Sequence, residues 1–199
     1  MIPVALFARP PQPGQVKTRL IPDIGSAAAT RVYRFCLEYA LELVRHCGLD
    51  YQLYLSADGD DELFQEERYR IQKGSDLGAR MHNALADLIA ANNDGAIIIG
   101  SDCLDLTPTH LQAAAQALGN HELVIVPAFD GGYALIGCTE ANPRLFDSVS
   151  WSTDQVLAQT IANAERLNYR VCLLETVRDI DTLHDLEQYP ELLSLITSS

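Results

Sequence analysis

The chain has 199 residues, a length that suits one α/β domain over residues 1–199 with a full hydrophobic core. Its formal net charge of −13 disfavours a broad surface for nucleic acid or for an anionic membrane. The apolar runs are strand-length rather than long enough for a membrane span, and the five cysteines form no CxxC pair, so we expect reduced thiols in a cytoplasmic protein.

A first strand is predicted over residues 2–8, and a stiff loop follows it. Three prolines and Gly14 exclude a helix in this loop and allow a ligand to approach the backbone. Lys17 and Arg19 follow Gly14, in a spacing that is not a Walker P-loop. Residues 1–37 carry five cations and one acid: Arg9, Lys17, Arg19, Arg31, Arg34 and Asp23. We therefore expect an exposed loop that binds a compact anion such as phosphate; a purely structural loop is the alternative.

Helix and strand patterns alternate in the next segment. A helix is predicted from Ser26 to about residue 47, then a strand over 51–57, an acidic loop over 58–68 and a short edge strand over 69–72. Asp76 is the expected N-cap of an amphipathic helix. The buried stripe of this helix should comprise Leu77, Met81, Leu85, Leu88 and Ile89. Arg80 in its first turn opposes the helix dipole, a conflict that a nearby anion would relieve.

The stretch 94–103 contains the most strongly predicted strand. Ile97, Ile98 and Ile99 form a β-branched run typical of a strand buried on both faces of a parallel sheet. Asp102 follows the end of this run, where ligands bind in open α/β sheets. It is therefore placed to hold a divalent cation; a helix cap or an Asx turn is the alternative.

The second half of the chain continues the alternation. Thr107 and Pro108 predict a helix start, and strands over 122–127 and 134–138 flank an Asp-Gly-Gly turn typical of a hairpin. Ser152 and Gln155 have the spacing of a capping box.

A last strand is expected over 171–177 before a C-terminal helix that starts at Thr182. The whole pattern predicts a three-layer α/β/α sandwich with a mostly parallel sheet.

Six ordered motifs resemble the bacterial DUF2064 family. They occupy residues 7–20, 76–81, 100–103, 127–133, 151–153 and 179–182. The family is described as glycosyltransferase-like and as the transferase associated with radical-SAM and selenium-related gene clusters. The resemblance implies the GT-A, or nucleotide-diphospho-sugar transferase, fold, with guanylyl- and cytidylyltransferases as distant kin. Leu104 and Ala134 depart from the family pattern, which usually has Pro and a second Tyr there.

The resemblance also implies roles for individual residues. Asp102 would bind Mg²⁺ or Mn²⁺, and Asp181, which also follows a terminal strand, is the expected second carboxylate; a cap for the final helix is its alternative. Asp130 would touch the metal, orient an acceptor hydroxyl or act as its base. Lys17 and Arg19 would be the catalytic cations that hold the phosphates. The expected nucleotide-binding residues are Ala8, Arg9, Gly14, Lys17, Arg19, Asp76, Gly78, Arg80 and Ser101. The expected acceptor-binding residues are Gly131, Gly132, Tyr133, Trp151, Ser152 and Thr153. A plain hairpin turn for Asp130 and simple packing for Trp151 are the alternatives.

Three classes of function are open at this point. The favoured one is a metal-dependent glycosyltransferase that uses a nucleotide sugar and a small-molecule acceptor, because the family description points to it. The second is a nucleotidyltransferase that takes an NTP and a phosphorylated small molecule and releases pyrophosphate. The dense Lys17 and Arg19 loop favours this second class slightly. The third is a non-catalytic nucleotide-binding module, which the three candidate carboxylates disfavour.

Overall fold

The computed structural model describes residues 1–65, 67–92 and 94–197, and a seven-stranded sheet forms its centre. The sheet has the order β3-β2-β1-β4-β6-β5-β7. Its strands are β1 (Val4–Ala8), β2 (Tyr51–Leu55), β3 (Tyr69–Ile71), β4 (Ala96–Ile99), β5 (Leu123–Pro127), β6 (Tyr133–Cys138) and β7 (Val171–Leu173). Only β6 runs antiparallel to its neighbours within the described sheet. The predicted mostly parallel sheet and the β5–β6 hairpin are confirmed.

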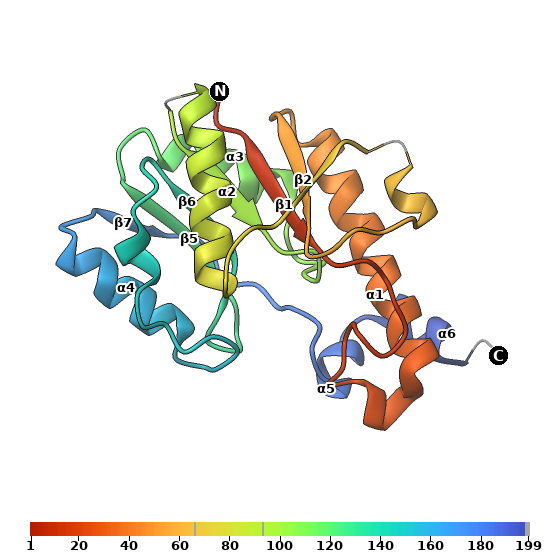
Figure 1. Ribbon diagram of the computed structural model, residues 1–199. Helices are drawn as coiled ribbons and strands as arrows, with labels where there is room; N and C mark the ends of the chain where they lie inside the picture. Colours follow the sequence, from red (N-terminus) through yellow and green to blue (C-terminus); the bar gives the residue numbers. More distant parts are fainter. Residues whose placement is uncertain (66, 93, 198–199) are drawn as a thin grey trace.

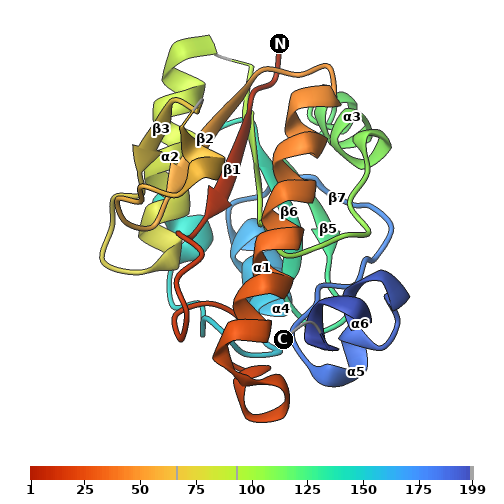
Figure 2. The same ribbon diagram turned by 90° about the vertical axis from the view of Figure 1, so that its right-hand side faces the viewer.

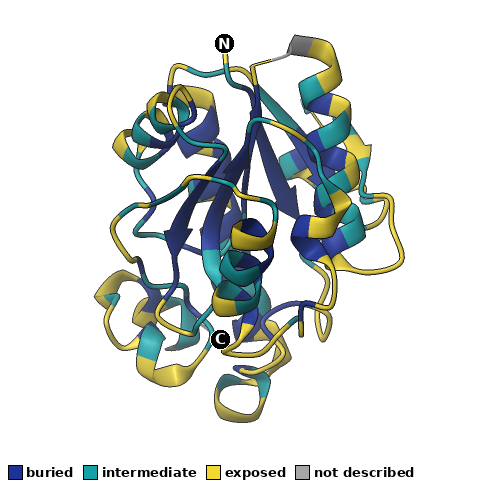
Figure 3. Ribbon diagram, turned by 90° about the vertical axis from the view of Figure 1, so that its left-hand side faces the viewer, coloured by how far each residue is buried: buried dark blue, intermediate teal, exposed yellow. Residues whose placement is uncertain are grey.

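Helices cover both faces of the sheet (Figure 1). They are α1 (Ile21–His46), α2 (Leu77–Asn92), α3 (Pro108–Ala117), α4 (Val156–Arg166), α5 (Leu183–Leu186) and α6 (Pro190–Thr197), with 3₁₀ turns η1 (Glu62–Phe64) and η2 (Pro143–Phe146). Val4 and Leu6 of β1 pack toward α1 and α3, whereas Ala5 and Phe7 pack toward α2 and α4. The buried sheet between half-buried helices in Figure 3 shows the predicted three layers. No helix among the described residues is long and apolar enough to cross a membrane.

Several element boundaries differ from the sequence predictions. Helix α1 begins at Ile21 rather than at Ser26, but its backbone leaves the helical conformation at Gly25 (φ 77°), so the long helix still begins beside Ser26. The predicted Ser152–Gln155 capping box is wrong. Ser152 has a left-handed φ of 64°, and α4 begins only at Val156, after a turn in which Gln155 N donates to Thr153 Oγ1.

Two further predictions need correction. The last strand ends at Leu173 instead of residue 177, and beyond it Val177 forms only an isolated bridge with Ala128. Leu77 does not belong to the buried stripe of α2. It is 43% exposed because the helix begins there, at the rim of a cavity, before its apolar face reaches the sheet.

The topology brings four loops to one edge of the sheet. The carboxyl ends of β1, β4 and β5 lie at this edge, and the hairpin turn into β6 begins there because β6 runs in the opposite direction. The segment after β7 returns to the same edge, where the buried Ile180 donates its N–H to the carbonyl of Asp102 (3.2 Å). Helices α5 and α6 then pack against α1 and hold this segment in place (Figure 2).

Candidate functional site

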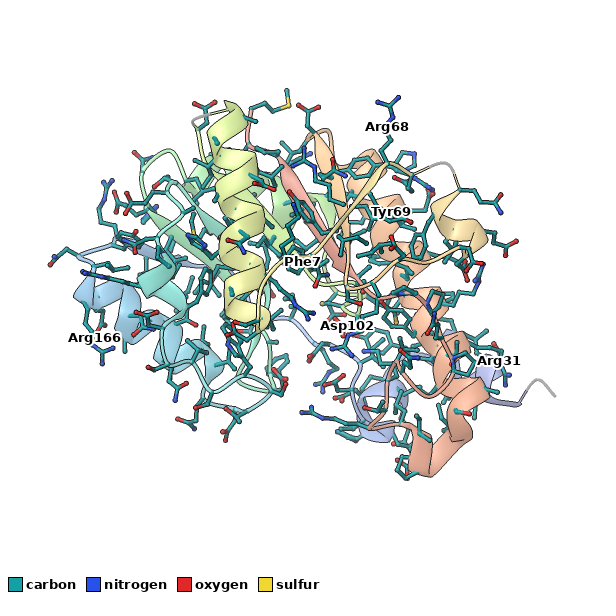
Figure 4. The ribbon with its side chains drawn as sticks, in the orientation of Figure 1. Phe7, Arg31, Arg68, Tyr69, Asp102 and Arg166 are labelled. Atoms are coloured by element: carbon teal, nitrogen blue, oxygen red, sulfur yellow. The ribbon has the colours of Figure 1, made fainter. Side chains whose placement is uncertain are left out.

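A cavity of about 530 Å³ lies at this edge of the sheet. Figure 4 shows Asp102 near the carboxyl end of β1, beside the loop that follows this strand. Many residues expected from the sequence to bind the nucleotide, the metal or the acceptor line the cavity: Ala8, Arg9, Lys17, Arg19, Asp76, Arg80, Ser101, Asp102, Trp151, Ser152 and Asp181. The cavity therefore brings together side chains from loops far apart in the sequence.

Lys17 is the buried cation of the site. Its side chain is 2% exposed, and its Nζ lies 3.2 Å from Asp102 Oδ2 and 3.5 Å from Asp181 Oδ1. Burial disfavours the charged ammonium, but the two carboxylates outweigh burial and raise the pKa of Lys17. The expectation of an exposed loop is wrong at this residue, because Val16 and Leu20 are buried and anchor the loop on both sides.

Arg19 faces solvent instead. Its side chain is 53% exposed and its Nη1 donates to Asp181 Oδ2 at 2.8 Å. The two cations expected to act alike thus have different environments: Lys17 is buried, whereas Arg19 is half-exposed and paired with Asp181 at the cavity wall.

Three carboxylates form a cluster beside the cavity. One oxygen each from Asp130, Asp179 and Asp181 lies within 4.8 Å of the other two. Burial, reinforced by the nearby carboxylates of Asp130, Asp102 and Asp181, raises the pKa of Asp179 to about 7. An all-oxygen set of this kind fits Mg²⁺ or Mn²⁺, and an ion would offset the mutual repulsion.

Asp179 had no role in the sequence prediction, although its motif was recognised. The sequence does contain a pattern that could have identified it: Asp179 and Asp181 flank the buried Ile180. Alternate residues of an extended segment face the same side, so the two carboxylates lie together. The predicted metal ligand Asp102 is not one of the three members of this cluster. It is linked to the cluster by Lys17, whose ammonium contacts both Asp102 and Asp181.

Asp130 combines two features that the sequence left as alternatives. Its Oδ1 accepts the N–H of Gly132 at 2.8 Å, which is the hydrogen bond of an Asx turn. Its carboxylate also belongs to the three-acid cluster. The turn therefore holds the carboxylate at the exposed tip of the β5–β6 hairpin.

Tyr33 of α1 is a site residue that sequence reasoning missed. Its buried hydroxyl accepts the N–H of Arg9 at 2.7 Å and lies 3.1 Å from Ser101 Oγ. It thereby joins the loop after β1 to the loop after β4. Gln72, also missed, donates from Nε2 to the carbonyls of Ala8 (3.3 Å) and Tyr54 (3.0 Å). Neither residue belongs to a recognised sequence motif. Tyr33 lies on a buried helix face, where a tyrosine is an ordinary core residue.

The expected acceptor residues divide into two groups. Trp151 and Ser152 line the cavity, whereas Gly131, Gly132, Tyr133 and Thr153 are not among its lining residues. Tyr133 packs into the core on the α2 and α4 side, where its hydroxyl is buried. At Gly131 (φ 88°) a Cβ would collide with the carbonyl of Asp154, so a glycine is required for packing.

The two remaining predicted glycines also lie outside the cavity lining. Gly14 (φ 81°) has open space around it. At Gly78 a Cβ would lie 2.7 Å from Cζ2 of Trp151, so this glycine lets the indole pack against α2. Trp151 also contacts Phe146, with ring centroids 6.3 Å apart. Trp151 therefore packs against α2 and Phe146 and also forms part of the cavity wall.

Residues 40–153 match the model of the DUF2064 family, described as an uncharacterized protein conserved in bacteria. No curated protein is significantly similar to the chain. A solved structure from Desulfovibrio desulfuricans G20, provisionally named a nucleotide-diphospho-sugar transferase, is 28% identical with a TM-score of 0.88. The match covers 98% of this chain and 97% of that one.

Two more distant structures share the fold. One is 4-diphosphocytidyl-2C-methyl-D-erythritol synthase from Anaerococcus prevotii DSM 20548, at 11% identity and a TM-score of 0.61, with 97% of this chain and 96% of that chain covered. The other is CMP:2-keto-3-deoxy-manno-octonic acid synthetase complexed with CTP, at 11% identity and a TM-score of 0.55, with 98% and 99% covered. The predicted nucleotide-diphospho-sugar transferase fold is confirmed.

Proposed function

The chain belongs to the DUF2064 family, and from this premise we propose that it is a transferase that binds an activated nucleotide donor in the cavity beside β1 and β4. The reaction that we favour is glycosyl transfer from a nucleotide-diphospho-sugar to a small acceptor. One observation carries the proposal: five aspartates and three arginines, brought from segments far apart in the sequence, meet at the carboxyl ends of the strands. This is the place where α/β sheets bind their ligands.

The base and ribose of the donor are assigned to the ends of the first strands. Ser56 donates its N–H to the carbonyl of Ala8, and Gln72 donates to the same carbonyl. Polar backbone and side-chain edges gathered in one corner of a cavity suit a heterocyclic base. The phosphates are assigned to Arg9, Arg19 and Arg80, whose guanidinium groups suit phosphate oxygens.

The metal is assigned to the neighbouring carboxylates, of which Asp181 contacts Arg19 directly. Asp102 and Asp181 remain the proposed ligands, and the structure adds Asp130 and Asp179 as candidates. A bound Mg²⁺ or Mn²⁺ would neutralise negative charge on the leaving diphosphate. Lys17, held between Asp102 and Asp181, supplies a fixed positive charge at the same place.

The acceptor is assigned to the hairpin side of the cluster. Asp130 lies at an exposed tip, and its turn fixes the direction of its carboxylate. It would accept the proton of an incoming hydroxyl, or orient that hydroxyl toward the donor. Trp151 and Ser152 line the donor cavity, where the carbonyl of Ser152 lies 3.5 Å from Nη2 of Arg19.

Nucleotidyl transfer is the second candidate. Two synthetases with the same fold favour it, since one of them was solved with CTP. The earlier argument from charge is weaker in the structure, because Lys17 and Arg19 are ion-paired with Asp102 and Asp181. A diphosphate donor therefore suits the remaining positive charge better than a triphosphate does.

The two candidate reactions break different bonds and therefore release different products, which can be identified. The protein is incubated with nucleotide sugars and, separately, with NTPs, each with Mg²⁺ or Mn²⁺, and the products are identified by mass spectrometry. We expect slow release of a nucleoside diphosphate from one nucleotide sugar, and no release by Asp181→Asn. Pyrophosphate from an NTP, with nucleotide sugars inert, would replace the favoured reaction with the second candidate.

A further inference from the structure

A second cavity of about 730 Å³ lies between α2 and two strands, β2 and the edge strand β3. Figure 2 shows β3 and β2 beside α2 at this side of the molecule. We call it the α2–β3 groove. Its side chains that matter here are Tyr54, Arg70, Lys73, Arg80, Asn83 and Asp87. The proposed transfer reaction uses none of them except Arg80, which lines both cavities.

The groove is positively charged in an acidic protein. It contains three cations and one acid, although the chain has 27 acids and a net charge of −13. Arg70 contacts Asp87 at 3.5 Å, which is a long ion pair. Neither Lys73 nor Arg80 forms a salt bridge among the described residues, although Asp76 is near enough to Arg80 to interact with it electrostatically. A concave surface with an excess of positive charge concentrates anions.

The floor of the groove has an unused hydrogen-bonding group. Tyr54 is 3% exposed, and its hydroxyl lies beside the guanidinium of Arg70 but makes no hydrogen bond of good geometry to any described residue. Buried hydroxyls are nearly always partnered in folded proteins. An anion oxygen, or a water molecule carried by the anion, would satisfy this group next to Arg70.

From these observations we infer that the α2–β3 groove binds the phosphate group of a small molecule other than the donor. Lys73 and Arg80 provide the charge, and Tyr54 provides a hydrogen bond at the floor. Because Arg80 can serve only one of the two cavities at a time, phosphate in the groove weakens donor binding, and the donor weakens phosphate binding equally. This coupling rests on the proposed function, whereas binding to the groove does not.

The binding is tested with inorganic phosphate in the absence of nucleotide and metal. Amide NMR shifts are followed during the titration, and we expect saturable changes at Asn83 and Ala84. Lys73→Gln should weaken phosphate affinity by about fivefold to tenfold, and Tyr54→Phe by about threefold, since each removes one contact of an exposed or half-open site. The matched control is Arg68→Gln, an exposed cation that points away from the protein body (Figure 4) and should leave the affinity unchanged.

Phosphate can also enter the donor cavity, so Arg19→Gln separates the two sites. This variant should leave the shifts of Asn83 and Ala84 intact, because Arg19 lines only the donor cavity. The inference is overturned if the shifts occur only at residues such as Ser101 and Asp102. It is also overturned if Lys73→Gln binds phosphate as tightly as Arg68→Gln does.

A second titration identifies the source of the phosphate group. Nucleoside diphosphate affinity is measured with and without inorganic phosphate. Phosphate should weaken it in the wild type and have less effect in Lys73→Gln. If Lys73→Gln weakens nucleotide binding without added phosphate, the groove serves the donor itself and the separate ligand is wrong. If no nucleotide binds at all, the proposed function is wrong. The titration with phosphate alone still shows whether the groove binds phosphate.

Discussion

The ammonium of Lys17 lies 3.2 Å from Asp102 Oδ2, although the two residues are 85 positions apart in the sequence. The same ammonium contacts Asp181, which is 164 positions away. One buried charge therefore joins the loop after β1, the loop after β4 and the segment after β7.

Lys17→Met should reduce the free energy of unfolding by about 2–3 kcal/mol, because removing one partner leaves Asp102 and Asp181 uncompensated. The estimate is at the low end because both carboxylates are partly exposed. Urea denaturation measures the change. The control is Arg19→Gln, whose side chain is 53% exposed and should cost less than about 1 kcal/mol. Equal losses in the two variants would mean that Lys17 does not hold the loops together.

Asp179→Asn and Asp181→Asn should each weaken Mn²⁺ binding by at least about tenfold, since each removes one carboxylate from an all-oxygen site. Asp102→Asn should keep the fold and abolish metal-dependent nucleotide binding. Isothermal titration with Mn²⁺, with and without nucleotide, measures both effects. Asp147→Asn removes an exposed carboxylate outside the cluster and is the matched control. Unchanged Mn²⁺ affinity in all the cluster variants would exclude a metal at these residues.

Asp130→Ala should reduce turnover more than it reduces donor binding, because the carboxylate is assigned to the acceptor. The alanine variant also removes the hydrogen bond to Gly132, so a folding effect has to be separated. The Asp130→Asn variant retains an oxygen that can accept this hydrogen bond. Its amide cannot act as a base as a carboxylate does. We expect Asn to restore thermal stability without restoring turnover. Full activity of the Asn variant would assign Asp130 to the turn alone.

Gly131→Ala should destabilise the protein by about 3 kcal/mol or more, because a left-handed φ and a collision with Asp154 act together. Gly14→Ala provides the comparison. It has a similar φ of 81° but nothing within 4 Å of the added Cβ, so it should cost only about 1–2 kcal/mol. Thermal unfolding of the two variants measures the difference. Similar losses would show that backbone conformation alone decides both positions.

The buried thiols should resist alkylation in the folded protein. Burial raises the pKa of Cys36, Cys103 and Cys138 to about 12 in each case. At pH 8 only about one thiol in ten thousand would then be the reactive thiolate. Native iodoacetamide labelling followed by mass spectrometry should find Cys172, which is partly exposed, modified first. Rapid native labelling of Cys36 would mean that the helix α1 region opens readily.

Much of the fold follows from local patterns in the sequence. The run Ile97–Ile99 is a fully buried strand, and Asp76 caps α2 by accepting the N–H of Ala79 at 2.9 Å. Thr182 and Asp185 form the capping box of α5. These features depend on residues close together in the sequence, so propensity and capping chemistry predict them.

The parts of the site that were missed depend on tertiary contacts. The burial of Lys17 could not be predicted, because its two carboxylate partners come from distant segments. Tyr33 has the pattern of a core residue, and only the approach of Arg9 and Ser101 gives its hydroxyl a role. Ser152 shows the reverse case. Its capping-box spacing is correct, but the turn before α4 places it in a left-handed conformation.

Trp151 gives the protein a built-in optical reporter. It is the only tryptophan of the chain, and its indole forms part of the wall of the donor cavity, against Gly78 and Phe146. Excitation at wavelengths where tyrosine does not absorb would therefore give fluorescence from this one position. A base, a sugar or a metal-bound phosphate that enters the cavity would change the polarity around the indole and so its emission. Ligand screening can thus follow unlabelled wild-type protein, with no dye and no coupled enzyme.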